Sequence, residues 1–301
     1  MRVSMANREK EDYAFRFAFL MMREKPVGEM ILSEDKIIRV LHHLVEGCSI
    51  RSTERITGVH RDTILKLLIA VGEKWEHLME ERIKEISVTD VQCDELWGYV
   101  GMKEKTKKKQ GIAQDGVGDA WAFVAIERHT KLVLAWHLGR RTVEDTVAFT
   151  EKLSQATADH NFQISTDGFA PYKDAVVLSL GAKQVDFAQL VKIYATPEEV
   201  RCSPAECIGA KKVPIFGNLD MDKVCTSHIE RQNLNVRMAM RRFARLTNAF
   251  SKKWAKLHAA LALYFAYYNF CRVHSSLHVT PAMEAGITST VWTLRDLLSA
   301  C

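Results

Sequence analysis

The sequence has no hydrophobic run long enough to cross a membrane. Near the N-terminus the longest apolar stretch, residues 15–22, is interrupted by Arg16 and followed by no small-residue cleavage site, so a signal peptide is not expected. Paired Cys-x-x-Cys zinc ligands and a disulfide framework are also missing, because the cysteines are scattered at positions 48, 93, 202, 207, 225, 271 and 301. Repeats and low-complexity segments are absent. These absences predict a cytoplasmic protein with reduced thiols and no membrane partner.

What is present is an ordinary globular composition in a chain of 301 residues. Apolar residues make up 47% and charged residues 26%, which is enough for a large core divided among one to three domains. The formal net charge of +5 indicates a nucleic-acid partner only weakly. How the charge is distributed therefore matters more than its total.

Residues 33–87 have a helical pattern. Helices are predicted over 33–47, 52–57 and 61–71, and Gly58 supplies the turn before the third. Three helices with a glycine-bearing turn before the last are typical of a helix-turn-helix DNA-binding domain, although any small helical bundle shows the same pattern.

The outward face of the third helix favours the DNA-binding alternative. It offers a DNA groove the side chains of His60, Arg61, Thr63 and Lys66. A charged helix over 75–86 is predicted to connect this domain to the next one. Residues 1–32 are left as an unassigned N-terminal segment.

From residue 88 the periodicity changes to that of strands. Apolar runs, alternating or continuous, predict strands over 91–100, 121–126, 132–138, 162–166 and 184–194. Helices are predicted over 142–157, where Thr142 and Asp145 form a capping box, and over 172–180. A three-strand meander followed by helix, strand, helix, strand and helix is the order of an α/β ribonuclease-H-like (retroviral-integrase-like) domain, here 88–250. Such an order alone does not give function.

The pattern lapses between residues 195 and 224. Prolines and glycines break up this segment, which is predicted to be a long loop or insertion. A long helix follows over 227–246. Another, over 252–270, belongs to a C-terminal helical tail, 251–301.

Three carboxylates are placed where catalysis would need them. Asp94 lies in the middle of the first strand, on the face opposite Glu95, where a charge is costly unless it is paired or metal-bound. Asp167 ends the fourth strand, at the sheet edge where α/β proteins bind ligands. Glu230 lies in the first turn or so of the long helix.

Taken singly, two of these carboxylates have ordinary explanations. Asp167 forms a turn with Gly168, and Glu230 interacts favourably with a helix dipole. Together, three carboxylates at one sheet edge are what two Mg²⁺ ions roughly 3.5–4 Å apart require for phosphoryl transfer. We expect Asp94 to bridge two such ions, for which Mn²⁺ can substitute, while Asp167 and Glu230 each complete the shell of one.

The chain around Glu230 is basic. Arg237 lies two turns further along the same helix face, where it could reach a phosphate beside the metals, and Asn233 adds neutral hydrogen-bonding capacity. Residues 231–256 contain no acid, whereas a solvated helix face mixes signs, so this stretch is predicted to follow DNA phosphates. Its cations are Arg231, Arg237, Arg241, Arg242, Arg245, Lys252, Lys253 and Lys256. For the lysine-rich run 103–109, a predicted flexible loop tip, DNA contact and plain solvation are equally open.

Three blocks of the sequence resemble transposases of the bacterial insertion-sequence-one family. They are 94–101 (DELWGYVG), 166–168 (TDG) with Tyr172, and 229–237 (IERQNLNVR). The resemblance, which runs over about 90–260, implies a ribonuclease-H-like fold and a DDE active site for magnesium-dependent cutting and joining of transposon ends. It implies that Asp94, Asp167 and Glu230 are the metal ligands and that Arg237 is the basic residue after the glutamate.

The sequence departs from that family in two places. Family members often begin with cysteine-containing zinc modules, whereas Cys48 is the only cysteine of the N-terminal part. The 195–224 segment lengthens the gap between Asp167 and Glu230. The tail, in contrast, resembles the closing segment of other insertion-sequence transposases and integrases, over 268–277 and at Thr280-Pro281.

The expected function is therefore that of a DDE DNA transposase. Its partners would be the double-stranded DNA of the element ends and of the target, with the protein nucleoid-associated when bound. A homo-oligomer is expected because two ends must be held together. The alternatives are a transposase-derived DNA-binding regulator without chemistry, a hydrolytic nuclease of the same fold, and a structural α/β protein with incidental acids.

Overall fold

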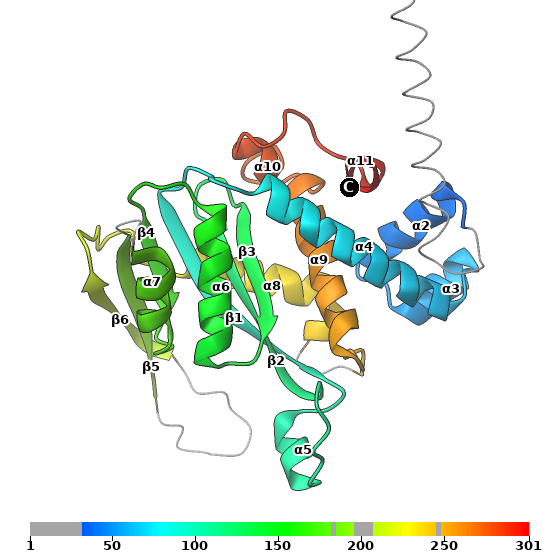
Figure 1. Ribbon diagram of the computed structural model, residues 1–301, viewed down its shortest axis with the longest axis horizontal. Helices are drawn as coiled ribbons and strands as arrows, with labels where there is room; N and C mark the ends of the chain where they lie inside the picture. Colours follow the sequence, from blue (N-terminus) through cyan, green and yellow to red (C-terminus); the bar gives the residue numbers. More distant parts are fainter. Residues whose placement is uncertain (1–31, 182–184, 196–206, 245–247, 301) are drawn as a thin grey trace, which may run out of the picture.

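The computed structural model in Figure 1 describes residues 32–181, 185–195, 207–244 and 248–300. A mixed six-stranded sheet forms the body, and a group of N-terminal helices lies beside it (Figure 1). Between the two lies a long C-terminal helix. The chain is thus an α/β protein, as the alternation of strand and helix patterns predicts.

The sheet has the order β3-β2-β1-β4-β5-β6. Its strands are β1 (Asp90–Val100), β2 (Gly118–Glu127), β3 (Val133–Gly139), β4 (Gln163–Asp167), β5 (Asp186–Tyr194) and β6 (Cys207–Phe216). The first three form an antiparallel meander. Helical crossovers then place β4 parallel to β1 and β5 parallel to β4. Strands β1 and β4 are therefore neighbours in the middle of the sheet.

Helices cover both faces of the sheet. On one face lie α6 (Val143–Ala156) and α7 (Tyr172–Leu180), and on the other lie α8 (Ser227–Ala239) and α9 (Trp254–Phe270) (Figure 1). Aromatic rings join β2 to the first pair, with centroids 5.7 Å apart for Phe123 and Phe149 and 6.4 Å for Phe149 and Tyr172. The predicted cap of α6 is half formed. Thr142 accepts the Asp145 N–H, but the Asp145 carboxylate accepts from the Arg140 N–H instead of closing a capping box.

Strand β6 corrects the prediction for 195–224. This segment was expected to be a loop, yet its residues 207–216 pair antiparallel with β5 (196–206 lie outside the described residues). The reason is its position at the end of the sheet. An edge strand pairs on one side only, so Pro214, which has no N–H to donate, is tolerated there.

The N-terminal helices are α2 (Glu34–Val45), α3 (Ile50–Thr57) and α4 (Arg61–Arg82). As predicted, Gly58 forms the turn before the third helix, with a φ of 69°. The two helices predicted over 61–71 and 75–86 are in fact one helix of 22 residues. Gly72 lies inside this helix without interrupting it. Its role is in packing, since a Cβ there would lie 2.7 Å from Ala259 Cα of α9. This glycine permits α4 and α9 to cross closely and does not terminate α4.

Helix α8 is shorter than predicted. It ends at Ala239, not near 246, and a 3-10 turn, η2 (Arg241–Phe243), follows. Arg237 fastens this turn, since its Nη1 donates a hydrogen bond of 2.9 Å to the carbonyl of Phe243. Arg241 and Arg242 are therefore carried by η2 and not by a continuous helix.

The expected flexible tip between β1 and β2 contains a short helix, α5 (Glu104–Lys109), which projects from the body of the molecule (Figure 1). Its first N–H group is held by Asp119, at 2.9 Å. This helix carries Lys105, Lys108 and Lys109 outward on the end of the β1–β2 hairpin, while the half-buried Lys107 donates from its Nζ to the Val117 carbonyl at 3.2 Å.

The tail is helical, as predicted, with α10 (Pro281–Glu284) and α11 (Leu294–Ser299) after α9. Helix α9 contacts both α4 and β3. Near the C-terminal end of α9, the Asn269 side chain forms the backbone hydrogen bonds to β3 that a neighbouring strand would otherwise form. Its Oδ1 accepts the Val133 N–H at 3.0 Å, and its Nδ2 donates to the Val133 carbonyl at 2.9 Å. The open side of β3 is thereby occupied at Val133.

Replacing Asn269 with Leu tests that contact. Asn269 is fully buried, so the Asn269→Leu variant would leave one N–H and one carbonyl of Val133 without partners. We expect a loss of about 2–4 kcal/mol in the free energy of unfolding, measured by urea denaturation. The control is Asn161→Leu at an exposed hydrogen bond to Asp186, with an expected change below about 0.5 kcal/mol. Equal effects in both variants would contradict the role given to Asn269.

No described helix is both long and apolar enough to span a bilayer. The five described cysteines, Cys48, Cys93, Cys207, Cys225 and Cys271, all carry free thiols, in line with the prediction of reduced cysteines.

Candidate functional site

The register of the central strands places two of the predicted carboxylates side by side. The parallel pairing of β1 with β4 ends at Cys93 and Thr166, so the next residues along the strands, Asp94 and Asp167, lie level with each other. Beyond them β4 stops while β1 continues. The site therefore lies at the carboxyl end of β4, the place where α/β sheets bind ligands.

A third carboxylate joins them there. Oxygen atoms of Asp94, Glu95 and Asp167 all lie within 4.8 Å of one another. Glu95 was missed because strand alternation assigns it to the face opposite Asp94. That assignment holds, since Asp94 contacts Asn233 of α8 while Glu95 lies near Tyr172 of α7. β2 flanks β1 here, but on the other side β4 ends at Asp167, so carboxylates on both faces of β1 can approach the same point at that open side.

The three carboxylates are crowded and poorly solvated. The Glu95 side chain is only 1% exposed, and burial, then the charge of Asp167, raises its pKa to about 8. Burial and Asp167 likewise raise the pKa of Asp94 to about 6. Asp167 is tied down by the Phe169 N–H, which donates 3.0 Å to its Oδ1. The cluster is therefore held together against its own electrostatic repulsion.

Arg141 partly compensates this charge. Its Nη2 lies 3.1 Å from Glu95 Oε2 and 3.4 Å from Asp167 Oδ2. The guanidinium is itself positioned by two rings, lying 4.2 Å from the centroid of Phe169 and 4.9 Å from that of Trp121. One guanidinium cannot neutralise three ionised carboxylates, so either protons, as the raised pKa values indicate, or a cation must balance the remaining charge.

These residues fit a divalent cation. Carboxylate oxygens are the ligands that Mg²⁺ and Mn²⁺ prefer, and three converge here. Glu95 Oε1 is also buried and forms no hydrogen bond of good geometry with the described residues, although the Tyr172 hydroxyl is near enough to lower the pKa of this carboxyl; such an atom is normally satisfied. A cation between the carboxylates would satisfy it and offset their repulsion.

The third predicted ligand, Glu230, lies outside this cluster. It is exposed, its carboxylate is 2.7 Å from the ammonium of Lys192 on β5, and it accepts a hydrogen bond from Thr226. It is still close enough for its charge to raise the pKa of Asp94, though less than burial and Asp167 do. Lys192 thus pairs with Glu230 and is also near enough for its charge to lower the pKa of Asp94.

Two polar residues fix α8 against the site. The Oε1 atom of Gln92 accepts the N–H groups of His228 and Ile229, at 2.9 and 3.2 Å, which satisfies free donors at the start of the helix. One turn further on, Asn233 Nδ2 donates to Asp94 Oδ2 at 2.9 Å. Gln92 therefore sets the position of the helix, and Asn233 sets the orientation of Asp94.

The predicted basic contacts fall in two places. Arg237 is engaged with the Phe243 carbonyl, so the prediction that it reaches a phosphate beside the carboxylates is not supported by its geometry. Arg241 and Arg242 line a groove next to α4, and Arg245 lies outside the described residues.

The predicted outward face of α4 is only partly correct. His60, which caps the helix, Arg61 and Lys66 are exposed. Thr63 is buried, at 7% exposure, and cannot serve as an outward contact. The reason is that α4 contacts α2, α3 and α9, so its buried surface is wider than one stripe of apolar residues indicates.

No family model matches this chain, and no curated protein matches it. What the site can do follows from the carboxylates, the arginine and the lysine that surround it.

Proposed function

We propose that the protein is a DNA transposase that cuts and joins DNA with a divalent metal. The observation that carries the proposal is the convergence of Asp94, Glu95 and Asp167 at the end of β4. The strand order β3-β2-β1-β4-β5, with helices on both faces, is compatible with a ribonuclease-H-like domain and supports the same conclusion. The family-level assignment rests on the resemblance of the three sequence blocks.

In this proposal Asp94, Asp167 and Glu95 would hold the cation, and Glu230 would join them if its ion pair with Lys192 opened. When bound, such ions activate an oxygen nucleophile and stabilise the charge that develops during phosphoryl transfer. Asn233 keeps Asp94 oriented toward the metal through its 2.9 Å hydrogen bond. Lys192, released from Glu230, is placed to contact a phosphate beside the carboxylates.

The N-terminal helices supply DNA binding in this proposal. Exposed Arg61 and Lys66 of α4 contact the double-stranded ends of the element, and basic residues set the register on phosphates. Because two ends are cut and joined together, the active form is a homo-oligomer.

The test is cleavage and strand transfer on the end DNA of the element, with Mg²⁺, comparing the wild type with Asp167→Asn. We expect the variant to lose at least about a thousandfold in both reactions, because one metal ligand is neutralised at a step that depends on charge stabilisation. Asp222→Asn, at an exposed position away from the cluster, is the matched control and should react like the wild type.

The outcomes separate the alternatives. Equal nicking by the wild type and Asp167→Asn would exclude these carboxylates as the active site. Nicking without joined products would identify a hydrolytic nuclease, and specific binding without either reaction would identify a regulator. Short inverted repeats flanking the gene would favour the transposase.

A further inference from the structure

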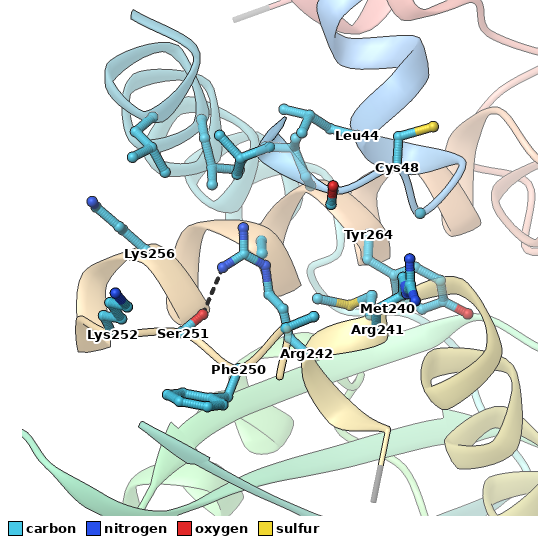
Figure 2. A pocket seen from close by; sticks show the side chains of 18 of the residues that line it. Leu44, Cys48, Met240, Arg241, Arg242, Phe250, Ser251, Lys252, Lys256 and Tyr264 are labelled. Carbon is cyan, nitrogen blue, oxygen red and sulfur yellow. Dashed lines mark hydrogen bonds between the residues drawn. The ribbon is translucent and has the colours of Figure 1, made fainter. Parts of the chain in front are cut away.

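A deep groove separates the N-terminal helices from the body of the protein. It has a volume of about 1070 Å³. One wall is formed by the α2–α3 turn and by α4, and the other by η2, residues 248–252 and the start of α9 (Figure 2). This groove is distinct from the carboxylate cluster, since none of the three carboxylates lines it.

The groove is strongly basic. Among the described residues no acidic side chain lines it, while both of its walls carry cations. The basic residues are Arg51, Arg61, Lys103, Arg241, Arg242, Lys252 and Lys256. None of them forms an ion pair with a carboxylate in the described part of the chain. A surface of one sign that leaves its charges uncompensated is suited to a polyanion.

Among these cations, Arg242 gives the strongest indication that the groove binds an anion. It rises from η2 into the groove, with Lys252 and Lys256 on one side and Leu44 and Cys48 on the other (Figure 2). Its Nη1 donates to Ser251 Oγ at 2.6 Å, a neutral partner. Burial lowers its pKa to about 10, and no described carboxylate opposes that effect. This half-buried guanidinium has further N–H donors to satisfy, and an anion entering the groove would satisfy them.

The dimensions of the groove exclude a duplex. At one end the walls touch, because a Cβ on Gly47 of the α2–α3 turn would lie 2.5 Å from the carbonyl oxygen of Ala239. Further along, α4 and α9 are in contact at Gly72. The volume is near the upper end of pockets that hold single small molecules, roughly 1,000 Å³. A few unpaired nucleotides fit such a space, whereas a double helix does not.

An aromatic platform lies at the same groove. Phe250 is half-buried, and its ring rests against Tyr99, with centroids 4.9 Å apart. Lys103 lies 5.8 Å from the Tyr99 centroid. Phe250 and Tyr99 both line the groove. A partly exposed ring next to phosphate-binding cations is the combination that binds single strands, because every base can stack on it.

We propose that this groove binds a short single-stranded segment of DNA, with phosphates at Arg242 and Arg241 and a base stacked on Phe250. The choice of DNA as the nucleic acid rests on the proposed function. The groove thus receives a strand separated from its complement, while the outward side of α4 contacts duplex.

The test is fluorescence anisotropy with a labelled oligo-dT of about 12 nucleotides, in EDTA so that no catalysis occurs. Unlabelled duplex of unrelated sequence and oligo-U serve as competitors. We expect Arg242→Gln to weaken binding at least about tenfold. The slope of the logarithm of the binding constant against the logarithm of salt concentration should fall by about the value of one phosphate contact. Phe250→Leu should weaken binding by about five- to a hundredfold through lost stacking.

Two controls keep the result interpretable. Lys173→Gln removes one exposed positive charge on α7, away from the groove, and should bind like the wild type. Arg241→Gln, at an exposed position, covers the case in which Arg242→Gln fails to fold, and should also weaken binding about tenfold.

Wild-type binding by Arg241→Gln, Arg242→Gln and Phe250→Leu would overturn the proposal, as would competition by duplex or oligo-U as effective as that by oligo-dT. Asp167→Asn should bind the oligonucleotide normally. If the groove variants bind like the wild type while cleavage still depends on Asp167, the proposed single-strand site is rejected and the proposed function stands. If the groove variants weaken oligo-dT binding but cleavage does not depend on Asp167, the proposed function is rejected and the single-strand site stands.

Discussion

The Asp94→Asn variant is expected to lose DNA cleavage by at least about a thousandfold and yet to be more stable than the wild type at neutral pH without metal. Burial, then Asp167, raises the pKa of Asp94 to about 6. Its value in the unfolded chain is about 3.9, so the folded protein binds this proton more tightly than the unfolded chain does. The stability that protonation contributes is complete below about pH 4 and is lost as the pH rises through about 6. At pH 8 the ionised carboxylate therefore costs on the order of 3 kcal/mol, which the neutral amide avoids.

Thermal denaturation in EDTA measures this effect. At pH 8 we expect a higher midpoint for Asp94→Asn than for the wild type, and at pH 4 the difference should close. Adding Mg²⁺ should raise the midpoint of the wild type, because a ligand that binds only the folded state stabilises it, and should have little effect on the variant. Asp222→Asn should follow the wild type throughout. A midpoint difference that is independent of pH, or equal stabilisation of both proteins by Mg²⁺, would contradict the assignment of Asp94 as a buried metal ligand.

The second large effect is expected at the crossing of α4 and α9. A Cβ on Gly72 would lie 2.7 Å from both Cα and Cβ of Ala259 and 2.9 Å from its carbonyl oxygen. Backbone atoms cannot turn away, so Gly72→Leu must push the helices apart along the contact that joins the N-terminal helices to the body. We expect a loss of about 3 kcal/mol or more in the free energy of unfolding.

A pair of identical substitutions isolates the steric cause. Alanine favours a helix over glycine by about 1 kcal/mol, so Gly→Ala normally stabilises. Gly181, at the end of α7 with a φ of −58° and nothing within 4 Å of its Cβ position, should behave in that way. Gly72→Ala should destabilise instead, by about 1–2 kcal/mol. Chemical denaturation of the two variants measures both values, and the same sign at both positions would sink the explanation.

Much of the fold could be predicted because its cause is local. Alternating apolar residues locate β1, and the predicted and observed bounds of the helix at 172–180 coincide. Asp167 could be chosen because a strand ending in Asp-Gly marks a ligand-binding edge.

The rest depends on partners far away in the sequence. Glu95 belongs to the cluster only because β4 stops beside it, and strand β6 forms only because β5 offers it an edge. Thr63 is buried by helices that pack around α4. Glu230 is drawn toward Lys192, 38 positions earlier, at 2.7 Å. None of these contacts has a signature in the local pattern of residues.

The hydrogen bonds of Asn269 to Val133 have a consequence for how copies of this protein can associate. They occupy the free N–H and carbonyl of β3 at the point where another strand would start to pair, and α9 lies in its way. The opposite edge, β6, has no such cover among the described residues, although Pro214 removes one donor. Strand addition could therefore proceed at one end of the sheet only. Two copies joined edge to edge through β6 would present outward only β3 edges that Asn269 blocks at Val133, which disfavours further growth of this kind.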